Sequence, residues 1–257
     1  MSRLEVSNLT VRYGGVAALT SVSLTIEPGT LVGLIGPNGA GKTTLIDTLT
    51  GFTAPADGRI VFDGDVITGL PPHERQRRGL VRTFQSLELF DDLIVRDNLL
   101  VAAATPDWRD PMADLVRPGR PVADDSVLDD VLDSLGLASL AQRYPPELSQ
   151  GHRKLVAVAR AVASRPSLML LDEPAAGLDT EASQLLGVHL RRLVDRATSL
   201  LLIDHDMGLV LGVCDVIFVL DFGRIIATGT PVEIQKDPAV VAAYLGVDAT
   251  AAPAESP

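Results

Sequence analysis

The chain has 257 residues, 22 basic and 33 acidic side chains, a formal net charge of −11, and one cysteine, Cys214. This length is enough for one large domain with a buried core, while the acidic balance argues against broad binding to nucleic acid, which needs clustered Lys and Arg. The single cysteine excludes an intrachain disulfide and fits a reducing cytosol, and the apolar stretches fall well short of the roughly 20 residues of a membrane span.

The first third of the chain is predicted to be rich in strands. Short apolar runs with β-branched residues occupy Leu4–Leu9, Val22–Ile26, Leu31–Ile35 and Gly58–Phe62. The third run leads into a glycine-rich segment and then into a helical pattern from Lys42 to Leu49, which is a strand–loop–helix order. We therefore expect residues 1–86 to combine antiparallel strands with the beginning of a parallel sheet.

Residues 87–155 have a helical character. Helical periodicity covers Val95–Ala104 and Val127–Leu135, and the Pro-, Asp- and Arg-rich connection Thr105–Asp125 is predicted to be an irregular loop. Upstream, Arg75, Arg77 and Arg78 form the one basic cluster, which we interpret as a solvated helix face.

Residues 156–247 alternate between helices and strands, and residues 248–257 are expected to form a frayed tail. The predicted elements are a helix ending at Ala163, strands Leu168–Leu171, Ser199–Ile203 and Val216–Leu220, and helices Glu181–Asp195 and Gly208–Val213. Such alternation predicts an α/β fold with a mostly parallel sheet, into which the helical block is inserted.

The strongest local signal is a complete match to G-x-x-x-x-G-K-[ST]. It comprises Gly36, Pro37, Asn38, Gly39, Ala40, Gly41, Lys42 and Thr43, and Thr44 follows. Glycines let successive backbone N–H groups point at phosphate oxygens, and the following helix adds its positive dipole end. Lys42 is expected to reach the β- and γ-phosphates, and the Thr43 hydroxyl to bind Mg²⁺.

A second signal is the buried strand that ends in Asp172 and Glu173. Carboxylates at the carboxyl end of a parallel strand lie where open α/β sheets bind ligands. Asp172 is the candidate Mg²⁺ partner, and Glu173 is the candidate base that polarises the attacking water. An acidic pair that caps a helix beside Pro174 is the alternative. The two signals together predict a P-loop nucleotidase, but they do not separate a kinase, a GTPase and a transporter motor.

Four further features resemble the ATP-binding cassette (ABC) ATPases, and they occur in that family's order. Leu148-Ser149-Gln150-Gly151-His152 stands in the place of the LSGGQ signature, before a helix expected from Arg153 to Ala163. The resemblance implies that Gln85 is the Q-loop glutamine that contacts Mg²⁺ and water, that Asp179 belongs to the D-loop, and that His205 is the switch histidine that contacts the γ-phosphate. It also implies that Tyr13 stacks on adenine.

In this family the signature residues complete the nucleotide site of an opposite subunit, so the resemblance implies a head-to-tail dimer. Ser149 and Gly151, at a helix N-terminus, suit binding of a γ-phosphate. Gln150 and His152 depart from LSGGQ, and we expect the motif to remain competent because the serine and the second glycine are kept.

The connection Thr105–Asp125 resembles the extra segment of the longer of the two ATPases that branched-chain amino-acid importers carry, and several shorter stretches also resemble the ATP-binding subunits of these importers. These stretches are Gly79–Gln85, Ile203–Met207, Asp221–Ile225 and Ala243–Gly246. The resemblance implies ATP and Mg²⁺ as cofactors, a second and shorter ATPase as dimer partner, two permease subunits, an extracytoplasmic binding protein, and a peripheral position on the inner face of the cell membrane. The alternatives are a soluble ABC ATPase without a transport role, and a motor for urea, amides or lipopolysaccharide.

Overall fold

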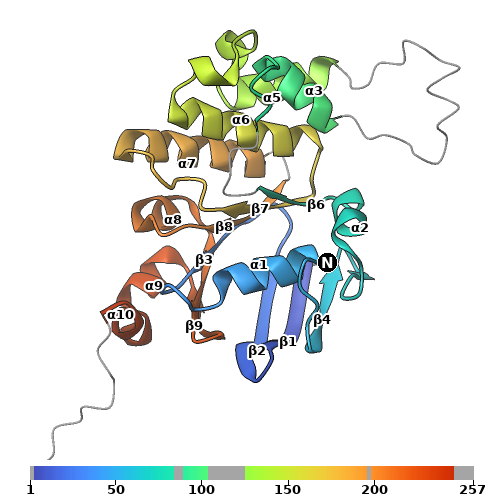
Figure 1. The fold of residues 1–257 in the computed structure, drawn as a ribbon. Helices are drawn as coiled ribbons and strands as arrows, with labels where there is room; N and C mark the ends of the chain where they lie inside the picture. Colours follow the sequence, from blue (N-terminus) through green and yellow to red (C-terminus); the bar gives the residue numbers. More distant parts are fainter. Residues whose placement is uncertain (1–2, 84–88, 104–124, 196–197, 246–257) are drawn as a thin grey trace, which may run out of the picture.

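The computed structural model describes residues 3–83, 89–103, 125–195 and 198–245, which form two sheets flanked by helices (Figure 1). The larger sheet has the strand order β10-β9-β3-β8-β7-β6. Its strands are β3 (Leu31–Ile35), β6 (Leu80–Thr83), β7 (Leu168–Asp172), β8 (Ser199–Ile203), β9 (Val216–Asp221) and β10 (Arg224–Gly229). All run parallel except β10, which pairs antiparallel with β9. The predicted mostly parallel sheet is therefore confirmed.

The smaller sheet is antiparallel and has the order β2-β1-β4-β5. It consists of β1 (Leu4–Tyr13), β2 (Val16–Ile26), β4 (Asp57–Phe62) and β5 (Asp65–Val66). Strands β1 and β2 both extend beyond the predicted ranges. Register shifts interrupt their pairing, and Asn8 and Ser21 have φ of 52° and 50°. These irregularities break the two-residue alternation on which a sequence-based strand prediction depends.

Helices cover both faces of the larger sheet. They are α1 (Lys42–Thr50), α2 (Pro72–Arg77), α3 (Val95–Ala103), α5 (Asp125–Ser134), α6 (Gln150–Ala163), α7 (Thr180–Asp195), α8 (Met207–Val213), α9 (Pro231–Lys236) and α10 (Pro238–Leu245). Short 3₁₀ turns occur at Ala138–Leu140 and Pro145–Glu147. Helices α3, α5 and α6 form a layer on the side of the larger sheet away from the antiparallel sheet (Figure 1). Within the described residues, none of the helices has the length and apolarity that would let it cross a membrane.

Several boundaries differ from the expectations. Asp125 begins α5 instead of ending a loop, and the rest of the predicted loop lies outside the described residues. The sequence did not indicate β5, β6, β10, α9 or α10. Strand β6 contains a charged residue, and β10 alternates between exposed and half-buried positions, so neither has a clear apolar pattern.

The central strands are buried on both faces, and alternate residues of each strand contribute to different cores. In β7, Met169 and Leu171 pack with α3, α5, α6 and α7, whereas Leu168 and Leu170 pack with α1 and the antiparallel sheet. The sequence of a strand that is buried on both faces is a continuous apolar run. This explains why the positions of β3, β7 and β8 could be predicted from the sequence.

Arg75 corrects the interpretation of the basic cluster as a solvated face, whereas Arg77 and Arg78 are exposed as expected. Its side chain is buried, with an exposed fraction of 2%, and it donates hydrogen bonds to the carbonyl oxygens of Thr48, Leu49, Thr68 and Leu70 at 2.7–2.8 Å. Two of these carbonyls belong to the end of α1, where helix carbonyls have no intrahelical partner. Arg75 therefore holds the helix that follows the glycine-rich loop.

Candidate active site

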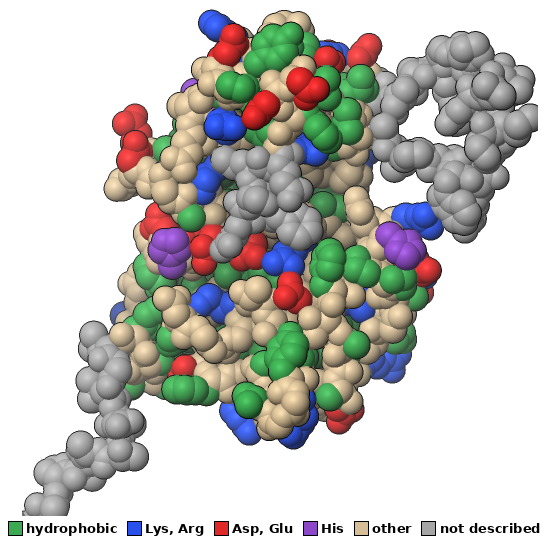
Figure 2. All heavy atoms as spheres, viewed as in Figure 1, with side chains coloured by type: hydrophobic (Ala, Val, Ile, Leu, Met, Phe, Trp, Pro, Cys, Tyr) green, Lys and Arg blue, Asp and Glu red, His purple; other side chains and the backbone are tan. Residues whose placement is uncertain are grey.

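The sheet topology brings the predicted site segments to one edge. Strands β3, β8, β7 and β6 are neighbours and parallel, so their carboxyl ends lie side by side. The glycine-rich loop follows β3, His205 follows β8, and Glu173 follows β7. Gln85, expected after β6, lies outside the described residues. On the face shown in Figure 2, a band of charged and histidine side chains crosses between the helical layer and the antiparallel sheet.

The glycine-rich loop has backbone conformations that only glycine adopts easily. Gly36 has φ of 154°, and a Cβ there would lie 2.0 Å from the carbonyl oxygen of Leu220. Gly41, the residue before α1, has φ of 107° and provides no side-chain cap. The first N–H groups of α1 therefore have no side-chain acceptor from this position, which leaves a cradle suited to phosphate oxygens.

Lys42 folds back over this loop. Its Nζ donates hydrogen bonds to the carbonyl oxygens of Gly36 at 2.6 Å and Pro37 at 2.9 Å. Burial lowers the pKa of Lys42, while the negative charges of Glu173 and Asp172 act in the opposite direction. The ammonium thus lies between the loop and the acidic end of β7, where it can bridge phosphate oxygens.

Asp172 is held by an arginine that sequence reasoning missed. Arg82 Nη2 donates to Asp172 Oδ2 at 2.9 Å, and Arg82 Nη1 donates to Asp47 Oδ1 at 2.5 Å. Both Arg82 and Asp172 are about nine-tenths buried. The available signal was an arginine directly after the apolar pair Leu80-Val81, because a buried guanidinium needs a carboxylate nearby.

The donor set fits Mg²⁺ held chiefly by phosphate and water. Oδ1 of Asp172 makes no hydrogen bond within the described residues, while Thr43 supplies a hydroxyl at the start of α1. In the part of the chain that the structure describes, no group of three or more His, Cys, Asp or Glu side chains is arranged so that it could hold a metal ion by itself. Mg²⁺ at nucleotide sites uses one or two carboxylates besides phosphates and water, so no such cluster is required.

Glu173 and His205 follow neighbouring strands. Glu173 has φ of 50°, its N–H donates to the carbonyl of Ile203 at 2.7 Å, and its carbonyl accepts from the N–H of Ala176 at 3.2 Å. The His205 side chain is 68% exposed, with Nδ1 3.6 Å from Asp204 Oδ1. The backbone of Glu173 is thus fixed on β8, while the His205 ring faces solvent and is accessible to a ligand.

Tyr13 and the signature residues were predicted to contact nucleotide, and they lie on other elements, namely the antiparallel sheet and the N-terminus of α6. Tyr13, at the end of β1, is 53% exposed, and its hydroxyl lies 3.3 Å from Thr53 Oγ1. Helix α6 begins at Gln150 instead of Arg153, with Ser149 as its N-cap. Ser149 Oγ accepts from the His152 N–H at 3.3 Å and lies 2.9 Å from His152 Nδ1.

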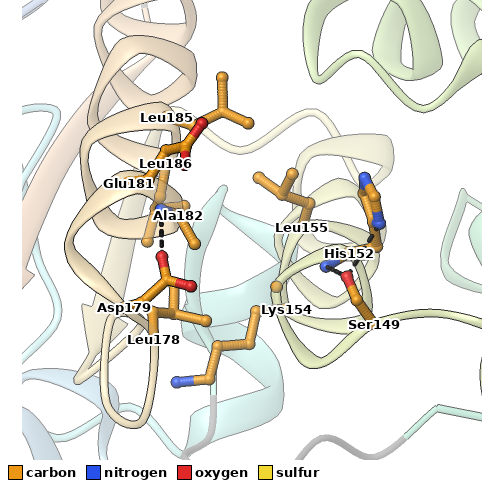
Figure 3. A pocket seen from close by; sticks show the side chains of 11 residues that line it. Ser149, His152, Lys154, Leu155, Leu178, Asp179, Glu181, Ala182, Leu185 and Leu186 are labelled. Carbon is orange, nitrogen blue, oxygen red and sulfur yellow. Dashed lines mark hydrogen bonds between the residues drawn. The ribbon is translucent and has the colours of Figure 1, made fainter.

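The signature residues face the D-loop across a pocket of about 220 Å³ between α6 and α7 (Figure 3). Ser149, Gly151 and His152 line one side, and Asp179 lines the other. Residues 36–44 do not line this pocket. The structure thus gathers the glycine-rich loop, Asp172, Glu173 and His205 at one sheet edge, and places the signature residues in a separate group.

Comparison with known proteins decides the family. A family model described as ABC transporter matches residues 19–176, which is more than half of the chain. The chain belongs to the ABC transporter ATPase family. A second model, described as branched-chain amino acid ATP-binding cassette transporter, matches residues 224–250.

Individual ABC proteins are similar over almost their whole length. The high-affinity branched-chain amino acid transport ATP-binding protein BraF of Pseudomonas aeruginosa is 40% identical, covering 96% of this chain and 99% of BraF. The corresponding protein LivG of Escherichia coli is 39% identical, covering 95% and 97%. The ADP conformation of an ATP-binding cassette of an ABC transporter matches with a TM-score of 0.83 and 32% identity, covering 96% of this chain and 100% of that structure.

These findings confirm the identification as an ABC ATPase, the α/β P-loop fold and the resemblance to branched-chain importer ATPases. As a member of this family, the chain is an ATP-binding subunit that hydrolyses ATP. The roles of individual residues and the domain boundaries at residues 86, 155 and 247 stay predictions.

Proposed function

We propose that this chain is the ATP-hydrolysing motor subunit of an importer of branched-chain or other hydrophobic amino acids. The observation that carries the proposal is the match of residues 224–250 to the branched-chain family model, added to similarity with BraF and LivG over almost the whole chain. A general ABC motor needs the phosphate loop and signature, whereas this C-terminal match distinguishes a subfamily.

Nucleotide is held by the glycine-rich loop and Tyr13. The N–H groups of residues 39–44 and the Lys42 ammonium bind the phosphates, and the exposed Tyr13 ring stacks on adenine. Thr43, Asp172 and Gln85 hold Mg²⁺. When bound, this ion neutralises charge on the phosphate oxygens.

Glu173 acts as the general base. A water oxygen attacks the γ-phosphorus, the bond between that phosphorus and the bridging oxygen to the β-phosphate breaks, and Glu173 takes a proton from the water. ADP and inorganic phosphate are the products. The backbone bond between Glu173 and Ile203 supports this role, because it fixes the base next to the strand that carries His205, the γ-phosphate contact.

The signature residues Leu148–His152 complete the site of a second ATPase subunit in a head-to-tail dimer. Their location away from the chain's own phosphate loop supports this arrangement. We propose a shorter ATPase as the natural partner, two permease subunits on which the dimer docks, and an extracytoplasmic binding protein that delivers the solute. The subunit then lies at the inner face of the cell membrane.

The test is affinity purification of the tagged chain from detergent-solubilised membranes, followed by reconstitution of the recovered complex in vesicles. We expect two polytopic permeases, a second ATPase and ATP-dependent uptake of leucine, isoleucine or valine in the presence of the binding protein. A matched complex with Glu173→Gln should bind ATP without uptake. Recovery with ribosomes or DNA in place of permeases would contradict the transport role, and uptake of urea or amides alone would contradict the solute.

A further inference from the structure

Helix α6 carries a buried lysine two residues after the last signature residue, His152. Lys154 is 9% exposed, and its Nζ donates a hydrogen bond to the carbonyl oxygen of Ala176. Figure 3 shows its side chain extending from α6 toward Leu178 and Asp179. Ala176 is three residues after Glu173, so this contact connects the signature helix to the segment that carries the proposed base.

A buried carboxylate holds the same segment. Asp204 is 2% exposed; its Oδ2 accepts from the Ala175 N–H at 2.9 Å, and its Oδ1 accepts from the Asp206 N–H at 3.0 Å. The backbone of Ala175 is therefore hydrogen-bonded to Asp204, which precedes His205, and the backbone of Ala176 is hydrogen-bonded to Lys154 on α6. Burial lowers the pKa of Lys154, and the negative charges of Asp204 and Glu173 oppose that effect. The Lys154 side chain therefore experiences the charges of both carboxylates.

A second contact lies on the same face of α6. Gln150 precedes Lys154 by four residues, a spacing that places two side chains on one face of a helix. A Cβ added to Gly177 would lie 3.0 Å from Gln150 Nε2, so the Gln150 amide lies directly against Gly177. Helix α6 therefore contacts residues 176 and 177 at two points, and a displacement of its N-terminus changes the position of this segment.

We propose that Lys154 is a positioning residue that couples the signature end of α6 to Glu173 of the same chain. The inference rests on the proposed function: Ser149 and Gly151 contact nucleotide held by the partner subunit, whereas Glu173 acts on the chain's own nucleotide. Through the bond to Ala176, nucleotide at one site of the dimer aligns the base at the other. Lys154 touches no reacting atom and acts through the backbone of residues 173–176.

The experiment compares Lys154→Met, Lys154→Arg and Arg153→Met with the wild-type full-length chain, each assembled with the same partner ATPase and permease subunits. Arg153 is the matched control, because it is adjacent on α6 but forms its ion pair with Asp91, at 3.5 Å. For each protein we would measure the nucleotide dissociation constant, the thermal unfolding midpoint, and ATPase rate against ATP concentration. A contact that only stabilises the fold lowers the unfolding midpoint without changing the shape of the rate curve.

We expect wild type and Arg153→Met to hydrolyse ATP cooperatively. Lys154→Met should lose about tenfold in kcat and show a Hill coefficient of about 1, with a nucleotide dissociation constant within about twofold of wild type because the phosphate loop is untouched. Lys154→Arg, which keeps a cation and donor, should restore most of the cooperativity. Cooperative hydrolysis by Lys154→Met, non-cooperative hydrolysis by wild type, or an equal loss in Arg153→Met would overturn the coupling role while leaving the motor function intact. Absence of hydrolysis by wild type would overturn both.

Discussion

Two helix N-termini of this chain are proposed to bind phosphate, and they are built differently. At α1, the N-cap is Gly41, and the loop before it packs against the backbone of Leu220. At α6, the N-cap is Ser149, whose exposed hydroxyl contacts the ring of His152, and the neighbouring pocket opens between two helices. The conformation at the N-terminus of α1 is therefore determined by backbone packing. The conformation at the N-terminus of α6 is determined by side chains near the surface.

From this difference we expect that one chain alone can bind nucleotide but cannot complete hydrolysis. The α1 region contains its loop, Lys42 and the supporting Arg75 within one packed unit, and so we expect it to bind nucleotide without a partner. The α6 region is proposed to present its donors to another subunit. Substitutions that disturb the α1 loop should therefore weaken nucleotide binding, whereas substitutions in the α6 region should change turnover without changing nucleotide binding.

The largest expected effect is that of Glu173→Gln. Removing the base should lower kcat by about 10²–10⁴-fold, while the ATP dissociation constant stays close to the wild-type value because Lys42 and the loop are unchanged. The closed dimer should then accumulate in ATP. Single-turnover phosphate release and size-exclusion chromatography measure the two quantities. Normal hydrolysis by this variant would show that another group is the base.

Arg75→Met tests whether the α1 region depends on its buried support. The change leaves four carbonyl oxygens without their charged donor and should lower the free energy of unfolding by about 3–5 kcal/mol. Arg78→Met is the control, since Arg78 forms an exposed ion pair with Asp65 whose loss should cost at most about 1 kcal/mol. Denaturant unfolding measures both. Equal effects of the two changes would refute the special role of Arg75.

Lys42→Ala should greatly reduce the affinity of the α1 region for ATP. Loss of charge-assisted hydrogen bonds to phosphate should weaken ATP binding by about 10–100-fold and reduce turnover as well. Isothermal titration calorimetry at fixed Mg²⁺ gives the dissociation constant, and the matched Lys154→Met variant should bind with nearly wild-type affinity. Tight binding by Lys42→Ala would contradict the phosphate-cradle role.

Cys214 gives the stability of the folded chain a pH dependence. Its Sγ lies next to Gly33 of β3, and burial raises the thiol pKa from 9.0 to about 12. The unfolded chain loses this proton above pH 9 while the folded chain keeps it, so stability is full below pH 9 and declines as pH rises toward 12, by at most about 1.4 kcal/mol per pH unit. Unfolding curves at pH 8 and 10.5 should diverge more for wild type than for Cys214→Ala; parallel changes would exclude the effect.

The smallest expected effect is that of His152→Gln in the α6 region. The Ser149 cap to the backbone N–H of residue 152 does not depend on the imidazole, so kcat should change by less than about threefold, within the range of surface substitutions. A large gain in kcat would show that histidine impairs the signature. The comparison needs the same dimer partner for both proteins.

The predictable parts of the fold are those whose signal is local. Leu31–Ile35 and Ser199–Ile203 have the predicted bounds, because apolar runs between turn residues suffice to define strands buried on both faces. The α1 loop was predictable for the same reason, since its conformation depends on neighbouring glycines. By contrast, β6 was missed because Arg82 interrupts its apolar run, and Arg82 is tolerated there only because Asp172 and Asp47 surround it.

The unpredictable parts depend on groups far apart in the chain. The acceptors of Arg75 belong to residues 48, 49, 68 and 70 and come together only after α1 and α2 pack. Lys154 and Ala176 likewise are 22 residues apart. Periodicity indicates that Lys154 is in a helix, but no pattern indicates which carbonyl it reaches.

The position of β3 in its sheet has a consequence for synthesis on the ribosome. Its two neighbours are β8 and β9, which begin at Ser199 and Val216, although β3 itself ends at Ile35. The strand that precedes the phosphate loop therefore emerges long before either strand with which it pairs, and Gly36 cannot reach its final contact with Leu220 until the last of them has been made. We therefore expect nucleotide binding to be acquired late in translation, because a nascent chain truncated before residue 199 lacks both strands that pair with β3.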